Sequence, residues 1–168
     1  MPPPKGSFNP IKGPGDYSTT STVHNDTYEA INPLKADLTE KTVYINGASR
    51  GPGRSMALSF AKAGASQIAI SARSNLEKVA RELKEAAKEA GRPEPEVLSL
   101  QMDVASPESV SKGISKIGTT FAKLDIVINN AAIMGQMKTV LDSDIDVWWE
   151  TSRSAPYKPQ ESEANCGQ

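Results

Sequence analysis

Residues 42–53, TVYINGASRGPG, decide how this sequence folds. Residues 42–45 read as a short buried strand, and they run straight into a turn that contains Gly47, Gly51 and Gly53. Glycine and proline end the strand, and the apolar spacing that follows indicates a helix. The stretch therefore predicts a strand, a glycine-rich turn and a helix in direct succession.

The same alternation continues on the carboxyl side of this stretch. Strand-like runs and helix-like stripes alternate from Lys41 to about Glu150, in steps of about thirty residues. Three further strands are expected at residues 67–71, 96–102 and 125–128. Repeated strand-helix-strand units build a parallel sheet with helices on both faces. The expected fold class is α/β, an incomplete doubly wound parallel sheet whose first four strands lie in the order 3-2-1-4.

The spacing of apolar residues predicts which helix faces point toward the sheet. Ser74 with Glu77 predicts a capping box for the second helix, and Ser106 before Pro107 predicts the start of the third. The residues expected to face inward are Met56, Phe60 and Ala61 in the first helix, Leu76, Val79, Ala80, Leu83, Ala86, Ala87 and Ala90 in the second, and Val110, Ile114, Ile117 and Phe121 in the third.

A glycine-rich turn between a strand and a helix suits the binding of a dinucleotide. Its backbone can approach a pyrophosphate closely, and the phosphate then lies on the unpaired N–H groups and the positive dipole end of the helix. The spacing here is G-x-x-x-G-x-G. Taken alone, a glycine pattern is equally compatible with a flexible turn, so further motifs are needed to decide.

Four ordered motifs at the ends of four successive strands supply that support. Residues 44–53, YINGASRGPG, resemble the T-G-x-x-x-G-x-G turn of the short-chain dehydrogenases/reductases. Residues 72–74 (ARS), 103–104 (DV) and 129–132 (NNAA) are similar to three further motifs of that family. The resemblance covers about residues 40–150 and implies a Rossmann-type fold that binds NAD(P).

The resemblance also implies a role for each matched residue. The three glycines shape the phosphate turn, while Ser49 and Arg50 reach the adenosine ribose and its phosphate. The aspartate and valine border the adenine, and the last asparagine-alanine pair lies under the nicotinamide ribose, with Asn129 bracing the central strands. The residues expected to bind the cofactor are Gly47, Ser49, Arg50, Gly51, Gly53, Arg73, Asp103, Val104, Asn130 and Ala131.

The end of the second strand indicates which cofactor is bound. An acidic residue there bonds the ribose 2′-hydroxyl of NAD, whereas an arginine can pair with the 2′-phosphate of NADP. This sequence has Ala72 and Arg73 there, with Arg50 available from the first turn. NADP is therefore preferred over NAD. Taken singly, each arginine is more simply a solvated surface charge, Asp103 a helix-capping acid, and the asparagine pair a turn former.

Two residues of the phosphate turn depart from the family pattern. Asn46 replaces the usual threonine and keeps a short polar side chain. Pro52 replaces an aliphatic residue and removes one backbone N–H that could face the pyrophosphate. Loss of one hydrogen bond is worth about 0.5–1.5 kcal/mol of binding free energy.

The catalytic residues that the resemblance implies are not found. In that family a tyrosine donates a proton to the carbonyl, with a lysine four residues on, a serine and a helical asparagine. Tyr157 is followed four residues later by Glu161, and the other tyrosines lie at or before the nucleotide motif. Residues 144–150 resemble the helix that leads into the asparagine-bearing one, and the resemblance stops after about Thr151. The sequence is thus expected to be the cofactor half of a longer enzyme.

The expected function is that of an NAD(P)-dependent oxidoreductase, which transfers a hydride between NADP(H) and a carbonyl or alcohol substrate. The alternatives are a catalytically inactive NADP-binding module and a non-functional truncated fragment. A small-molecule substrate is expected only if a longer product exists. Neither the substrate nor the oligomeric state can be inferred from these residues.

Composition limits the other functional classes. Nineteen basic and twenty acidic residues give a net charge of −1, which provides no field for nucleic acid. One cysteine and one histidine argue against disulfides, a metal site or a Ser-His-Asp triad, and no apolar run reaches the length of a membrane span. The expected location is the cytoplasm. By composition the chain divides into a disordered arm or surface strap (1–40), the nucleotide-binding part (41–150) and an irregular tail (151–168).

Overall fold

The computed structural model describes residues 27–133 and 139–154, so most of the arm and most of the tail lie outside the described residues. Within them, strands and helices alternate as the sequence predicts, with strand ends shifted by at most one residue. The central elements are β1 (Thr42–Asn46), α1 (Gly51–Lys62), β2 (Gln67–Ala72), α2 (Glu77–Glu89), β3 (Glu96–Gln101), α3 (Pro107–Thr120) and β4 (Ile126–Ile128).

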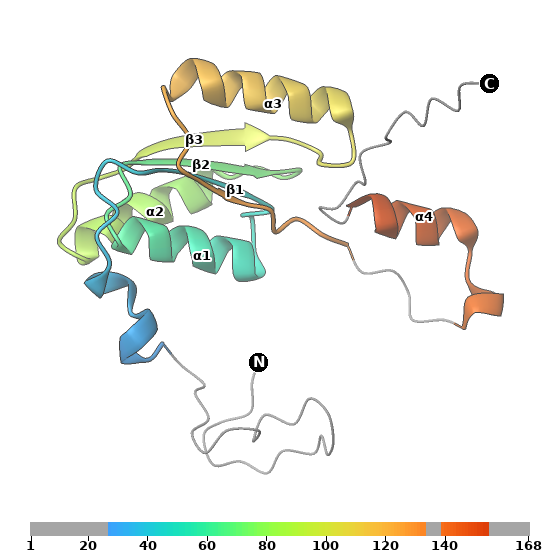
Figure 1. Cartoon of the computed structure of the whole chain (residues 1–168), viewed down its shortest axis with the longest axis horizontal. Coiled ribbons are helices and arrows are strands. Elements are labelled where there is room, and N and C mark those ends of the chain that lie inside the picture. Colours follow the sequence, from blue (N-terminus) through green and yellow to red (C-terminus); the bar gives the residue numbers. More distant parts are fainter. Residues whose placement is uncertain (1–26, 134–138, 155–168) are drawn as a thin grey trace, which may run out of the picture.

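The four strands form one parallel sheet in the order β3-β2-β1-β4, which confirms the predicted topology. Helices α1 and α2 cover one face of the sheet and α3 covers the other (Figure 1). Among the described residues β4 pairs only with β1, and its Val127 is 50% exposed. Because all four strands run in one direction, the residues that follow them meet at one edge of the sheet.

The apolar core lies on both faces of the central strands β1 and β2. In β1, Val43 and Ile45 pack toward α1 and α2, while Tyr44 packs with residues of α3. The side chains of β2 alternate in the same way. A strand covered on both faces has no polar alternation, which is why residues 42–46 are buried throughout.

Helix α1 buries small side chains, and the prediction for Met56 was wrong. Gly53, Ala57 and Ala61 are the buried residues of α1, one per turn on a single face. Phe60 is half-buried against the core, whereas Met56 is half-buried and lies outside both core clusters. The small side chains let α1 lie close to the sheet, where a methionine at the centre of the contact would hold it away.

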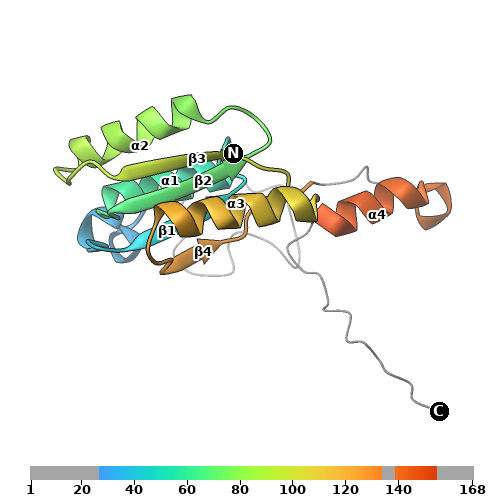
Figure 2. The same ribbon diagram turned by 90° about the horizontal axis from the view of Figure 1, so that it is seen from above.

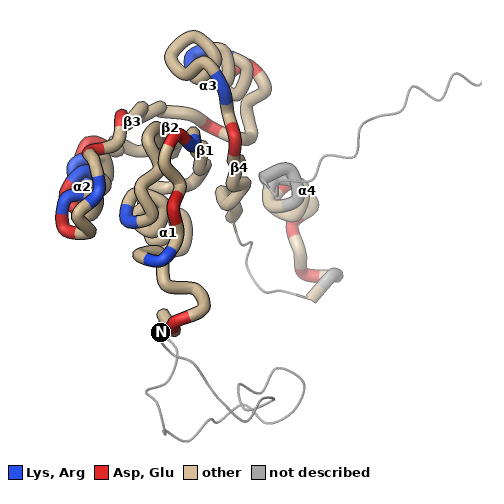
Figure 3. Tube along the Cα trace, turned by 60° about the vertical axis from the view of Figure 1, so that its left-hand side comes forward, with Lys and Arg blue, Asp and Glu red and all other residues tan. Residues whose placement is uncertain are grey.

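Helix α2 begins without the capping box expected from Ser74 and Glu77, so that prediction was also wrong. The Oδ1 atom of Asn75 accepts the Glu77 N–H at 2.7 Å, because the asparagine lies closer to the first turn than the serine. The serine expected to cap α3 does so: Ser106 accepts the N–H of Ser109 at 3.3 Å. Lysine, arginine and glutamate alternate along the exposed side of α2 (Figure 3).

Helix α3 contacts the sheet through a different line of residues from the one expected. Ile117 is buried, but Ile114 is 48% exposed, which corrects its predicted inward position. Gly113 is buried instead, and a Cβ added there would lie 2.5 Å from the sulfur of Met102. The absent side chain lets α3 rest on this methionine, while Ile114, the next residue of the helix, belongs to neither core cluster.

The described chain resumes after β4 with η3 (Val140–Asp142) and α4 (Ile145–Ser154), which stand apart from the sheet in Figure 2. The helix continues past residue 150, where the nucleotide-binding part was predicted to end, and stops at Ser154. Proline disfavours helical backbone in the residue before it, and the residue before Pro156 comes directly after Ser154. Trp148 and Trp149 are 57% and 58% exposed and stack with 5.8 Å between ring centroids.

Residues 27–40 lie along the surface at the opposite end of the sheet from the motif residues (Figure 1). They contain two short helices, η1 (Glu29–Ile31) and η2 (Pro33–Lys35). Arg92 donates to the carbonyl of Ala36 at 2.8 Å and so holds this segment to the loop after α2. Within the described ranges, no helix combines the length and the apolar character that crossing a membrane requires.

The two isoleucines of α3 provide a matched test of this packing. Ile117→Ala is expected to lower the free energy of unfolding by about 2–4 kcal/mol, because it opens a cavity under the helix. Ile114→Ala should lower it by less than about 1 kcal/mol, since that side chain is half-exposed. Denaturant unfolding measures both values, and equal losses would show that the assigned helix face is incorrect.

Candidate functional site

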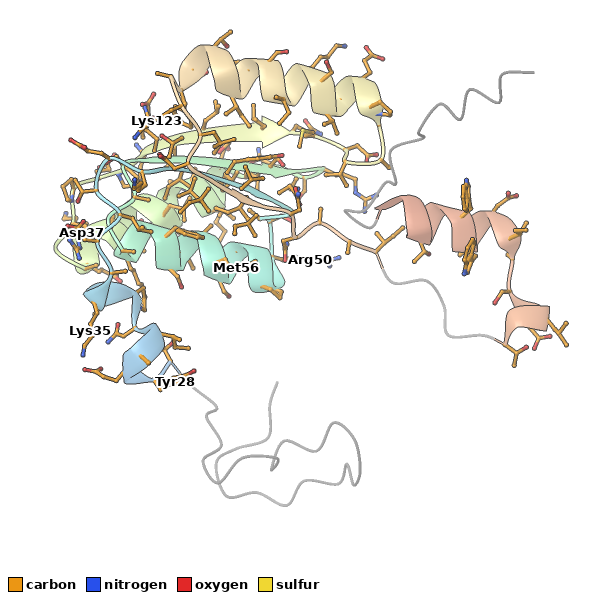
Figure 4. The ribbon with its side chains drawn as sticks, viewed as in Figure 1. Tyr28, Lys35, Asp37, Arg50, Met56 and Lys123 are labelled. Atoms are coloured by element: carbon orange, nitrogen blue, oxygen red, sulfur yellow. The ribbon has the colours of Figure 1, made fainter. Side chains whose placement is uncertain are left out.

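A cavity of about 860 Å³ opens at the carboxyl ends of the strands. Nine of the ten residues predicted to bind the cofactor line it, and Gly53 is the exception. In Figure 4, Arg50 lies at this end of the sheet, and Asp37 and Lys123 lie at the other. The lining residues are Gly47, Ser49, Arg50, Gly51, Pro52, Ser71, Ala72, Arg73, Ser74, Met102, Asp103, Val104, Ala105, Asn130, Ala131, Ala132 and Ile133.

Two glycines are required by the backbone of the turn between β1 and α1. Gly47 has a φ of 68° and Gly51 a φ of 57°, in the left-handed region that other residues rarely adopt. A Cβ at Gly47 would also lie 2.8 Å from the Cα of Ala131, so the turn packs directly on the segment after β4. These glycines let two stretches of backbone line one wall of the cavity.

Gly53 has a packing role beneath the turn. It is buried in the first turn of α1, and an added Cβ would collide with the carbonyl oxygen of Gly47 and lie 2.5 Å from Nδ2 of Asn130. The residue predicted to shape the phosphate turn therefore brings α1 close to the strand end and does not line the cavity.

Asn46, the last residue of β1, connects the glycine turn to the end of β4. Its Oδ1 atom accepts the backbone N–H of Asn130 at 2.8 Å and that of Ala131 at 2.6 Å. Its Nδ2 atom donates to Oδ1 of Asn129 at 2.7 Å. In return, Nδ2 of Asn130 donates to the carbonyl of Gly47 at 3.1 Å. These bonds fix the turn and the segment after β4 as one unit.

The amino terminus of α1 points its first backbone groups toward the cavity. The helix begins at Gly51 with no side-chain cap from Arg50, and Pro52 occupies its first turn. The N–H of Arg54 donates to the carbonyl of Arg50 at 3.4 Å. The unpaired N–H groups and the dipole of such a helix end attract an anion, although Pro52 contributes no N–H.

Two arginines add positive charge to the cavity wall. The side chains of Arg50 and Arg73 are exposed and form no ion pair with any residue in the ranges 27–133 and 139–154. By contrast, Arg54 pairs with Glu82 at 2.7 Å, and Arg92 lies 3.9 Å from Asp37. The arginines at the cavity are thus available to an anionic ligand.

The floor of the cavity rests on Tyr44, which is buried behind it. The Tyr44 hydroxyl lies 3.0 Å from Oγ of Ser71 and 3.9 Å from the sulfur of Met102. Burial raises the pKa of the Tyr44 hydroxyl, which the hydrogen bond with Ser71 partly offsets. This tyrosine therefore stays protonated at neutral pH and serves as a structural residue.

Asp103 begins the turn between β3 and α3. Its Oδ1 accepts the N–H of Ala105 at 2.9 Å, and its own N–H donates to Oγ of Ser109 at 3.1 Å. The carboxylate orders its own loop and also lines the cavity. In the described part of the chain, no group of three or more His, Cys, Asp and Glu residues is arranged to hold a metal ion.

Several lining residues were not predicted from the sequence. Ser71 lies at the end of β2 and Met102 follows β3, so they belong to the strand ends where ligands of open α/β sheets bind. That rule would have identified them. Asn46 was recognised only as a conservative departure, and nothing in its sequence position indicates that it makes three hydrogen bonds.

Comparisons with known proteins agree with this geometry. A family model described as short chain dehydrogenase matches residues 41–156. The chain is 49% identical over 150 residues to the short chain dehydrogenase pigC of Monascus ruber, which covers 89% of this chain and 50% of that protein. A second relative, tazN of Aspergillus terreus, is 47% identical over 89% of this chain and 32% of its own. The chain spans half or less of these relatives.

The fold also matches a solved structure that contains a dinucleotide. L-sorbose reductase from Gluconobacter frateurii, complexed with NADPH and L-sorbose, is 32% identical with a TM-score of 0.59. The match covers 68% of this chain and 43% of that one. The similarity therefore lies within less than half of the length of that enzyme.

Replacement of Asn46 tests whether its carboxamide holds the site. Asn46→Ala should lower the free energy of unfolding by about 2–4 kcal/mol, because two backbone N–H groups lose their acceptor. Asn46→Thr should lower it less, since a hydroxyl oxygen remains. Asn32→Ala is the control, because that side chain accepts one exposed N–H bond, and thermal unfolding would show a small change there. A loss for Asn46→Ala no larger than for the control would contradict the assignment.

Proposed function

The chain belongs to the short-chain dehydrogenase family, and on that basis we propose that the cavity binds NADP(H) for hydride transfer between this cofactor and a carbonyl or alcohol. When bound, NADPH supplies the hydride. The observation that carries the proposal is that the turn of Gly47 and Gly51, the two exposed arginines and the Asn130–Ala131 segment line one cavity.

The glycine turn fits the pyrophosphate of a dinucleotide. The positive φ angles of Gly47 and Gly51 expose backbone, and α1 begins at that point with uncapped N–H groups. A pyrophosphate there accepts hydrogen bonds from this backbone and lies at the positive end of the helix dipole. Ser49 borders the same position, while Asp103 and Val104 lie on the wall expected to hold the adenine.

The preference for NADP over NAD rests on charge at the end of β2. The strand ends in Ala72, which is 8% exposed and offers no carboxylate to a ribose 2′-hydroxyl. Arg73 follows it, and Arg50 lines the same cavity. Two guanidinium groups that have no ion-pair partner in the described part of the chain favour a 2′-phosphate, to which arginine donates charge-assisted hydrogen bonds. The solved L-sorbose reductase, which contains NADPH, supports this choice.

A second candidate function is an NADP-binding module without turnover. It is favoured by one observation: no tyrosine in the 168 residues has a lysine four positions on, the pair that carbonyl reduction uses in this family. The cytoplasmic location and the absence of nucleic-acid partners stay predictions from composition.

The two arginines are tested by binding NADPH and NADH to single variants. Arg50→Ala and Arg73→Ala should each raise the Kd for NADPH about tenfold and the Kd for NADH by less than about threefold, because only NADPH carries the 2′-phosphate. Arg81→Ala, an exposed arginine of α2 away from the cavity, is the control. Equal losses for both cofactors would remove the phosphate assignment.

Turnover distinguishes the two candidate functions. The 168-residue chain is expected to enhance NADPH fluorescence on binding, yet to oxidise no NADPH when a carbonyl compound is added. The physical reason is that no tyrosine in the 168 residues has a lysine four positions on, the pair that would donate the proton. Carbonyl-dependent oxidation of NADPH by this chain would show that another residue performs that role, and absence of binding would remove both candidates.

A further inference from the structure

We propose that Gln101 is a positioning residue for Arg73 and thereby sets the preference for the 2′-phosphorylated dinucleotide. The inference rests on the proposed function and goes beyond it, because Gln101 does not line the cavity. Its side chain acts on the backbone from which Arg73 projects, and the resemblance to known families assigns it no role.

The first observation is a side-chain bond that prolongs the sheet. Ala72 of β2 and Gln101 of β3 are the last paired residues of the two strands. The N–H of Met102 donates to the carbonyl of Ala72 at 2.9 Å and closes the backbone ladder. The Nε2 atom of Gln101 then donates to the next carbonyl, that of Arg73, at 3.0 Å. Where the backbone pairing of the two strands ends, this side-chain bond therefore continues the ladder by one residue and holds the first residue of the loop.

The second observation is that the loop after β2 is held at its far end too. The Oδ1 of Asn75 accepts the N–H of Glu77 at 2.7 Å, and Leu76 is buried with 4% exposure. Arg73 and Ser74 lie between these anchors, and both are exposed and line the cavity. Among the residues that the structure describes, only the Gln101 bond fixes the Arg73 end of this loop through a side chain.

These two anchors fix the position of the backbone from which the Arg73 side chain extends. A side chain on an ordered backbone loses less conformational entropy when it pairs with a ligand, so binding is tighter than from a mobile loop. The benefit applies to the phosphate that Arg73 contacts and not to the pyrophosphate, which lies on the turn after β1. Loss of the Gln101 bond should therefore weaken the binding of NADPH and leave the binding of NADH nearly unchanged.

The neutral charge of Gln101 is part of this role. A carboxylate at the same position would face the carbonyl oxygen of Arg73 and donate nothing to it. It would also compete with the 2′-phosphate for the Arg73 guanidinium. Gln101→Glu should therefore reduce the preference for NADPH more than Gln101→Met, which only removes the donor from a side chain of similar length.

The experiment measures Kd for NADPH and NADH in the full chain and in three variants. Gln101→Met and Gln101→Glu test the bond. Gln67→Met is the matched control, because Gln67 also joins β2 to β3, through a 2.9 Å bond from its Nε2 to Glu96, at the opposite end of the sheet. Backbone amide hydrogen exchange at residues 73–76 is followed in the same proteins without cofactor.

We expect Gln101→Met to raise the Kd for NADPH by about threefold to tenfold and the Kd for NADH by less than about twofold. Exchange at residues 73–76 should become faster in both Gln101 variants and not in Gln67→Met. Equal changes for the two cofactors, or an unchanged exchange rate in this loop, would overturn the inference. A wild-type chain that binds NADPH no tighter than NADH would overturn the proposed cofactor preference as well, whereas a preference for NADPH that is undiminished in Gln101→Met overturns the inference alone.

Discussion

One buried carboxamide determines the shape of the cavity. Asn46 is 7% exposed, ends the central strand, and receives on one oxygen the N–H groups of the two residues that follow Asn129. The phosphate side of the cavity comes from the turn after β1, and the opposite side comes from the segment after β4. A buried N–H that loses its acceptor destabilises the fold by about 1–3 kcal/mol, so these bonds keep both sides in register.

Strand order and the membership of the cavity could be predicted because a parallel sheet brings its carboxyl ends together. Once each strand end is known to within one residue, the residues that follow are known to be neighbours, and nine of ten predicted residues do line one cavity. The contacts of Asn46 could not be predicted in this way. They depend on the register between Ile45 and Ile128, which is a property of the assembled sheet.

The errors in the helix faces have a common physical cause. Periodicity identifies the inward side of a helix, but the residue at the centre of the contact depends on how closely the helix approaches the sheet. In α1 and α3 the central residues are Ala57 and Gly113, and the larger neighbours Met56 and Ile114 are displaced toward solvent. Small residues carry little hydrophobic signal, so the sequence favours the large ones.

The stacked indoles of α4 separate the tryptophan fluorescence of the chain from the fluorescence of a cofactor bound in the cavity. Trp148 and Trp149 are its only tryptophans, and neither lines the cavity. Tryptophan fluorescence thus originates on a solvent-exposed helix and is sensitive to any molecule that contacts this helix. A nicotinamide cofactor in the cavity fluoresces from a different environment. The efficiency of energy transfer from the two indoles to the nicotinamide then depends on the distance between α4 and the ends of the strands.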